Sequence, residues 1–171
     1  MTKPIQIFIS YAQEDAVSRE ALTKHLASLR RSGKVTLWSD NQITLGVNWD
    51  DQTRDRLRQA DIVALLLSGD FMNSDHIWDN ELKESLARRE KGEKVMLLPI
   101  LVKPCLLTGT IFEKIQRLPR NQQAVSEHAN LDEAWYKIAV EISAVVDSFQ
   151  ETVSAVSQAT ASGDVADAVN K

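Results

Sequence analysis

Short apolar runs alternate with longer amphipathic stretches along most of the 171 residues. The runs are five to eight residues long and rich in β-branched residues, leucine and aromatic residues, which is typical of buried strands. The stretches between them have apolar residues at the 3.6-residue period of a helix. The predicted strands are residues 5–10, 34–38, 62–67 and 95–102, and the predicted helices are residues 15–31, 49–59, 81–90 and 130–146.

Strand and helix in regular alternation indicate a parallel sheet with helices on both faces. We therefore expect an α/β, flavodoxin-like doubly wound fold of four to five strands, with the short run 124–126 as the candidate for a fifth, edge strand. Pro99 lacks a backbone N–H, so the strand that contains it is expected at an edge or a bulge. Ligands of such folds bind beyond the carboxyl ends of the strands, at the switch point between the first and third.

The stretch 68–86 follows the most apolar run directly and contains Phe71, Trp78 and Glu81. A carboxylate just beyond a buried strand and beside aromatic rings is typical of a chemical site. The alternative is a solvated glutamate that the helix dipole favours in a first helical turn. Topology favours the site, because the ends of the first three strands bring several polar and aromatic side chains toward one cleft. These are Phe8, Ser10, Asp40, Trp78 and Glu81.

Composition restricts the class of protein further. The chain is 43% hydrophobic and 26% charged with a net charge of −4, which argues against a general nucleic-acid or membrane surface. Its single cysteine, Cys105, forms neither an intramolecular disulfide nor a cysteine metal site, and its three histidines lack metal-ligand spacing. No signal peptide or membrane-spanning run is recognisable. We therefore expect a cytoplasmic protein without a metal or its own anchor.

Two segments differ from the alternating pattern. The loop after the second strand contains Ile43, Leu45 and Val47 around Gly46, so it either folds back on the core or contacts a partner. Residues 150–171 contain no leucine, isoleucine or aromatic residue and are rich in alanine, serine, threonine and valine. These features predict a domain at 1–148 followed by a disordered low-complexity tail or linker at 149–171.

Five segments together resemble the TIR (Toll/interleukin-1 receptor) domains. Residues 7–11, Ile-Phe-Ile-Ser-Tyr, are similar to the opening F-I-S-Y of that family, and residues 37–46 to its second strand and BB loop. Residues 62–71 resemble its third strand, and residues 78–82, Trp-Asp-Asn-Glu-Leu, its aromatic-x-x-Glu-Leu helix. The resemblance covers about residues 5–146, in the family's order, and implies a TIR fold.

The resemblance also implies an activity. Bacterial TIR domains of this appearance cleave the nicotinamide–ribose bond of NAD+, and their catalytic glutamate corresponds to Glu81. The expected products are nicotinamide and either ADP-ribose or a cyclic ADP-ribose isomer, with NAD+ as substrate and no cofactor. The family's tryptophan precedes this glutamate by four residues, where this chain has Ile77, so Trp78 either stacks on the substrate or only packs. The expected substrate-binding residues are Phe8, Ser10, Tyr11, Asp40, Trp49 and Trp78.

The resemblance further implies self-association of TIR domains, as a homo-oligomer or filament, through the BB loop. The residues expected in that contact are Ile43, Leu45, Gly46 and Val47. A sensing domain or partner protein and a role in bacterial immune or stress signalling, such as antiphage defence, are also implied. A non-enzymatic signalling scaffold that acts through the same loop is the alternative function.

A phospho-receiver is a second alternative, because it shares the doubly wound topology. Asp70 after the third strand and Lys103 after the fourth have the order that a receiver requires. Glu14 and Asp15, however, follow the first strand too late, after Ser10 and Tyr11, which argues against this class.

Overall fold

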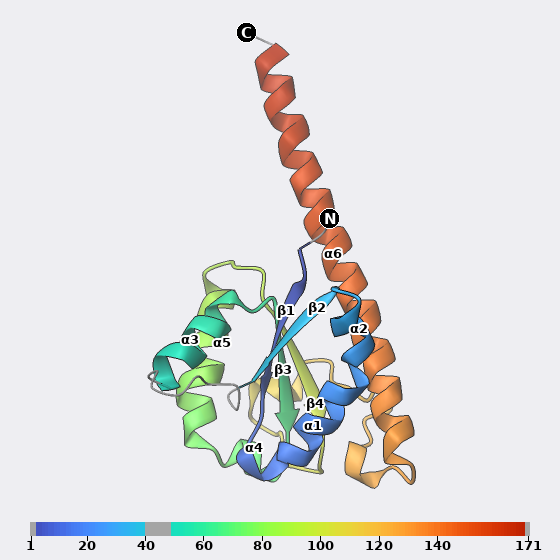
Figure 1. The fold of residues 1–171 in the computed structure, drawn as a ribbon. Helices are drawn as coiled ribbons and strands as arrows, with labels where there is room; N and C mark the ends of the chain where they lie inside the picture. The colour runs from blue at the N-terminus through green and yellow to red at the C-terminus, as the bar shows by residue number, and fades with distance from the viewer. Residues whose placement is uncertain (1–2, 40–48, 170–171) are drawn as a thin grey trace.

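The structure, a computed structural model, describes residues 3–39 and 49–169 (Figure 1). Its sheet contains four parallel strands in the order β2-β1-β3-β4, so the doubly wound α/β topology is confirmed. The order reverses between β1 and β3, which is the predicted switch point. The strands are β1 (Ile5–Ser10), β2 (Val35–Ser39), β3 (Ile62–Leu67) and β4 (Met96–Leu101).

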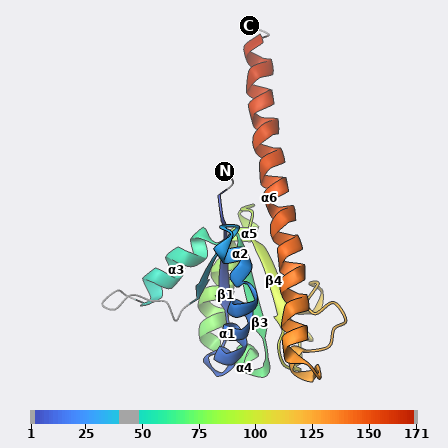
Figure 2. The same cartoon turned by 45° about the vertical axis from the view of Figure 1, so that its right-hand side comes forward.

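Helices cover both faces of the sheet (Figures 1 and 2). One face packs against α1 (Ala16–His25), α2 (Ala27–Arg31) and α6 (Leu131–Val169). The other packs against α3 (Trp49–Gln59), α4 (Gly69–Met72) and α5 (Lys83–Glu90). Successive residues of β1 therefore enter opposite layers of the core, Ile7 and Ile9 on the first face and Phe8 on the second. Every residue of β3 is buried, as expected for a central strand with both faces covered.

The predicted fifth strand at 124–126 is wrong. Residues Val125–Glu127 form a 3-10 turn, η5, and Leu118 alone occupies the edge beside β4. The Leu118 N–H donates to the carbonyl of Pro99 at 3.0 Å, and its carbonyl accepts from the Leu101 N–H at 2.7 Å. Pro99 thus faces the outer edge of β4, where its missing N–H removes no bond to β3. The edge position predicted for this strand is confirmed.

The predicted helix 15–31 is divided by a bend. A 3-10 turn, η1 (Gln13–Asp15), precedes α1, and Leu26, with φ −93° and ψ 4°, separates α1 from α2. The segment has apolar residues at the helical period, among them Leu22 and Leu26, and both of these are buried. The periodicity of the apolar residues thus identified the buried face of the helix correctly. It did not reveal the bend, because the same face packs against the sheet before and after it.

Helix α6 continues through the segment predicted to be a disordered tail. It runs as one helix of 39 residues to Val169, and its C-terminal part projects away from the sheet (Figures 1 and 2). Residues 150–169 contain no proline and many alanines, so the backbone continues the helix although little surface is available to bury. No described helix is both long and apolar enough to cross a membrane.

An arginine holds α3 against α5. One terminal nitrogen of Arg88, Nη1, donates to the carbonyls of Leu57 and Ala60 at 2.6 and 2.7 Å, which satisfies backbone acceptors at the end of α3. Its Nε donates to Glu93 at 2.6 Å. A second contact between these helices joins Arg58 Nε of α3 to Glu84 Oε1 of α5 at 3.0 Å. These contacts fix the distance between the two helices that flank the candidate site.

Candidate active site

Glu81 lies in η3 (Ile77–Leu82), a π-helical segment between α4 and α5. Its side chain is on the buried side of this segment with Ile77 and Leu82, and the residue is only 3% exposed. The alternative of a solvated glutamate in a first helical turn is therefore wrong. Short π-helical segments are rare and occur often at functional sites.

Ser10 contacts the carboxylate of Glu81 directly. It is the last residue of β1, is 1% exposed, and its hydroxyl donates a hydrogen bond to Glu81 Oε2. In the sheet Ser10 of β1 is paired with Leu65 of β3. This pairing brings the end of β1 close to Glu81, which follows β3 in the chain. A hydrogen bond to an ionised group is about twice as strong as one between neutral groups. It stabilises a carboxylate that would otherwise be costly to bury.

Two cavities meet at Glu81. The first, of about 390 Å³, lies between α3 and the segment η3–α5, with Thr53 and Leu57 in its wall; we name it the α3–α5 cavity. The second, of about 400 Å³, lies beside the loop after β1, with Tyr11 and Gln13 in its wall; we name it the β1-loop cavity. Glu81 and His76 line both. Each volume is within the range of small-molecule sites.

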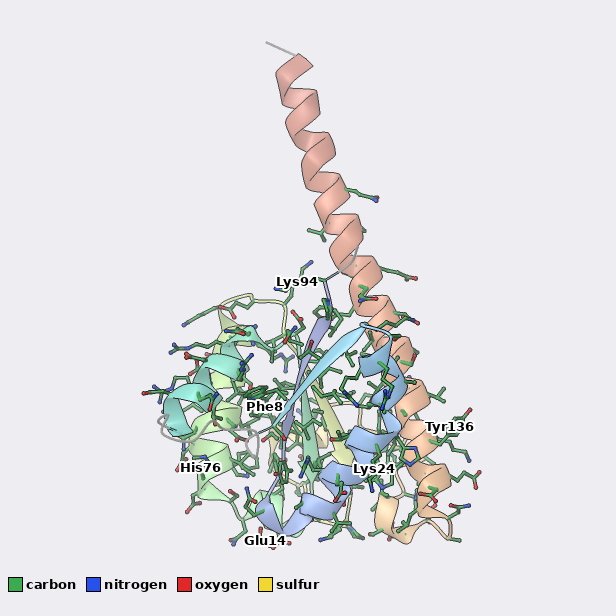
Figure 3. The ribbon with its side chains drawn as sticks, viewed as in Figure 1. Phe8, Glu14, Lys24, His76, Lys94 and Tyr136 are labelled. Carbon is green, nitrogen blue, oxygen red and sulfur yellow. The ribbon has the colours of Figure 1, made fainter. Side chains whose placement is uncertain are left out.

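Figure 3 shows where these cavities lie on the molecule. The labelled side chains of Glu14 and His76 are at the end at which β1 and β3 finish, and Lys94 is at the opposite end. Glu14 lines the β1-loop cavity and His76 lines both cavities, so both cavities reach the carboxyl end of the sheet. This is the end at which ligands bind in doubly wound folds.

His76 lines both cavities, although the sequence placed it only near the proposed site and assigned it no role. The side-chain amide of Asn80 holds it, with Nδ2 at 3.0 Å from the His76 carbonyl and 3.3 Å from Nδ1. A carbonyl oxygen can only accept, so Asn80 must direct its NH₂ group toward the His76 carbonyl. His76 Nδ1 lies next to the same NH₂ group and therefore acts as an acceptor. The position of His76 five residues before Glu81 was the only signal in the sequence.

The predicted aromatic residues occupy different environments. Phe8 is 1% exposed and lines neither cavity, whereas Tyr11 lines the β1-loop cavity with Arg19 5.6 Å from its ring centroid. Trp78 packs edge-to-face against Phe71 and Phe112, with centroids 6.5 and 5.7 Å away, and also lines neither cavity. Its indole N–H donates to the Phe71 carbonyl at 3.3 Å. Of the two roles left open for Trp78, the geometry favours packing.

The remaining predicted residues have no described side chains. Asp40 and the BB-loop residues lie outside the described residues, and so does the side chain of Trp49. The BB-loop residues concerned are Ile43, Leu45, Gly46 and Val47.

A second buried carboxylate, Asp15, ties three strand ends together. It occupies the N-cap position of α1 without a capping hydrogen bond. Instead, the hydroxyl of Ser68 donates to its Oδ2, and Lys103 Nζ lies 2.7 Å from its Oδ1. The hydrogen bond to Asp15 is the main cause that raises the pKa of Lys103, and the negative charges of Asp70 and Glu14 act in the same direction. This network joins the loop after β1 to the ends of β3 and β4.

The same network argues against a phospho-receiver. Asp15, one of the two acids that follow the first strand, is bound by Ser68 and Lys103 and is not free to hold a metal ion. Within residues 3–39 and 49–169, no three His, Cys, Asp or Glu side chains are grouped so as to hold a metal ion. A receiver needs such an acidic metal site beside its acceptor aspartate.

A four-stranded doubly wound sheet with a buried glutamate at its switch point defines an α/β protein whose candidate site lies between β1 and β3. The chain belongs to the TIR domain family, because the family model of the TIR domain matches residues 7–135. The resemblance noted in the sequence is thereby confirmed at the level of the family.

Two relatives can be compared. The uncharacterized protein y4lF of Sinorhizobium fredii (strain NBRC 101917 / NGR234) is 30% identical over 149 residues, which are 87% of this chain and 46% of that protein. The chain thus spans about half the length of this curated relative. A structural comparison is provided by the crystal structure of the TIR domain of the Toll-related receptor TRR-2 from Hydra magnipapillata (crystal form I), whose sequence is 22% identical to this chain. It matches 60% of this chain and 74% of that chain, with a TM-score of 0.46.

Proposed function

We propose that this TIR domain is an NAD+ nucleosidase that cleaves the nicotinamide–ribose bond, with Glu81 as the catalytic residue. The observation that carries the proposal is a buried carboxylate, hydrogen-bonded by Ser10, in the shared wall of two ligand-sized cavities. A carboxylate held in a site of low water content stabilises developing positive charge far better than one in solvent.

The chemistry of this bond suits a single carboxylate. Cleavage at the glycosidic carbon passes through an oxocarbenium-like transition state, as in glycoside hydrolysis. Nicotinamide leaves as a neutral molecule from a cationic ring, so no acid is needed to protonate it. Glu81 would stabilise the positive charge that develops on the ribose and accept hydrogen bonds from its hydroxyls. Attack by water gives nicotinamide and ADP-ribose, and attack by a group of the same nucleotide gives a cyclic isomer.

The direct test is incubation of concentrated protein with NAD+ and chromatographic identification of the products. Glu81→Gln keeps the size of the side chain and one acceptor oxygen but removes its charge, so we expect it to reduce turnover by about 100-fold or more. Glu90→Gln is the matched control, because Glu90 is exposed at the end of α5 and outside both cavities. Unchanged turnover in Glu81→Gln contradicts the proposal.

TIR domains act in signalling and commonly self-associate, and we propose that association of copies of this chain activates it. The support comes from the sequence, where Ile43, Leu45 and Val47 gather apolar side chains in one loop. Activity per molecule should rise with protein concentration, and Leu45→Asp should abolish both this rise and the self-association seen by sedimentation. Self-association lost together with unchanged turnover contradicts the activation step. Self-association without any NAD+ cleavage favours the signalling scaffold.

A further inference from the structure

The cations that line the two cavities are confined to one of them. Among the described residues, the β1-loop cavity is lined by three carboxylates and by no lysine or arginine. The α3–α5 cavity has both signs of charge in its wall. The three carboxylates are those of Glu14, Asp70 and Glu81. The α3–α5 cavity has three cations, those of Arg54, Arg58 and Lys83, beside three carboxylates of its own, those of Asp79, Glu81 and Glu84.

Not all of these charges are equally available to a ligand. Arg58 is 3.0 Å from Glu84, so its charge is already paired. No ion-pair partner is found for Arg54 or Lys83 within the part of the chain that the structure describes. On the acidic side, Lys103 is close enough to Asp70 and Glu14 for their charges to act on it, but its ammonium group is bound to Asp15.

NAD+ has a matching distribution of charge. Its nicotinamide ring is cationic, its pyrophosphate has two negative charges, and the bond to be cleaved joins the ring to the first ribose. If that bond lies at Glu81, the two ends of the molecule extend to opposite sides of this residue. Electrostatic complementarity determines the orientation of a ligand more than its total affinity.

We infer that the dinucleotide binds across Glu81, with its nicotinamide ring in the β1-loop cavity and its pyrophosphate beside Arg54 and Lys83 in the α3–α5 cavity. This assignment rests on the proposed function and identifies Arg54 as a specificity-determining residue. The guanidinium group contacts the phosphates and not the reacting carbon. Its loss should therefore weaken binding of substrates that contain the pyrophosphate and leave the chemical step unaltered.

The test compares two substrates that share the same scissile bond, NAD+ and nicotinamide riboside, of which only NAD+ has phosphates. In Arg54→Gln we expect the KM for NAD+ to rise about fivefold to tenfold, with kcat within twofold and with nicotinamide riboside cleaved as by the unaltered protein. Arg30→Gln, at the exposed end of α2, removes the same charge far from both cavities and is the matched control. An equal loss with both substrates, an unchanged KM for NAD+ or an equal effect of Arg30→Gln overturns the assignment.

A binding measurement separates this inference from the proposed function. ADP-ribose contains the pyrophosphate but not the nicotinamide, and its affinity is measured by calorimetry without any turnover. We expect Arg54→Gln to weaken ADP-ribose at least fivefold and Asp70→Asn, in the other cavity, to leave it unchanged. Absence of cleavage together with this pattern refutes the nucleosidase and retains the phosphate site. Cleavage without this pattern, or no ADP-ribose binding at all, overturns the phosphate site.

Discussion

At the scale of single residues, the site depends on a charge in an unusual place. A carboxylate that is 3% exposed is destabilised unless polar groups replace the water that it has lost. The hydroxyl of Ser10 is one such group, and it comes from a strand end 71 positions away in the sequence. Ser10 therefore acts on the reaction, in the proposed mechanism, by positioning Glu81.

Ser10→Ala should lower kcat/KM for NAD+ by about 10-fold to 100-fold, because a hydrogen bond to a charged group is worth about 1.5–3 kcal/mol. Ser85→Ala is the matched control. Ser85 is also buried, but its hydroxyl donates at 2.9 Å to the backbone carbonyl of Glu81 and not to the carboxylate. Equal losses of activity in the two variants, with folding verified by circular dichroism, contradict a role of Ser10 through the carboxylate.

The raised pKa of Lys103 predicts how stability depends on pH. A lysine whose pKa is higher in the folded protein stabilises the fold fully below its ordinary pKa of 10.5, and this stabilisation is lost as the pH rises through the raised value. Above about pH 10.5, the free energy of unfolding of the unaltered chain in urea should therefore fall as the pH rises. In Lys103→Met this fall should be smaller. Lys137→Met, which removes an exposed pair with Glu133, should retain the full fall.

At the scale of elements, the geometry of the site depends on how α3 and α5 pack. Short local contacts determine each helix, but the distance between them is set by side chains that cross from one to the other. Arg88 is the clearest example, because one guanidinium reaches two carbonyls at the end of α3 and the carboxylate of Glu93. A planar group with several donors in fixed directions suits this task better than an ammonium group.

Arg88→Lys should lower the free energy of unfolding by about 1–3 kcal/mol, because at least one buried acceptor loses its donor. Arg89→Lys, at the neighbouring and exposed position of α5, should change it by less than about 0.5 kcal/mol. Urea unfolding at neutral pH measures both. Similar values for the two variants contradict the role of Arg88 as the contact between the helices.

At the scale of the whole molecule, α6 combines two parts with different roles. Its first part buries Trp135, Ile138 and Ile142 against the sheet, and its last part projects beyond the sheet (Figures 1 and 2). Stability should depend on the first part, since a helical segment that projects beyond the sheet adds little to the free energy of unfolding.

Removal of residues 157–171 should therefore change the melting temperature by less than about 2 °C, whereas Ile142→Ala should lower the free energy of unfolding by about 2–5 kcal/mol. Thermal and urea unfolding followed by circular dichroism provide both values. A loss of several kcal/mol on truncation shows instead that the projecting part contacts the domain.

The order of the elements, the parallel sheet and the TIR family were all predictable from the sequence. Strand and helix periods are local patterns, and the connection rules leave few topologies for them. The sequence also predicted Glu81 as the central residue of the candidate site, because the third strand leads toward it and because it matches the glutamate of the family's aromatic-x-x-Glu-Leu helix.

Other features were decided only by the tertiary structure. The burial of Glu81, its hydrogen bond from Ser10 and the packing of Trp78 against Phe71 and Phe112 join residues from different elements, and no local period records such contacts. The same holds for Asp15, whose local position predicts a helix cap but whose partners are Ser68 and Lys103. The sequence by itself thus determined which strands end at the site. Which side chains are buried there, and which charged groups they contact, was decided by the packing of elements that are distant in the chain.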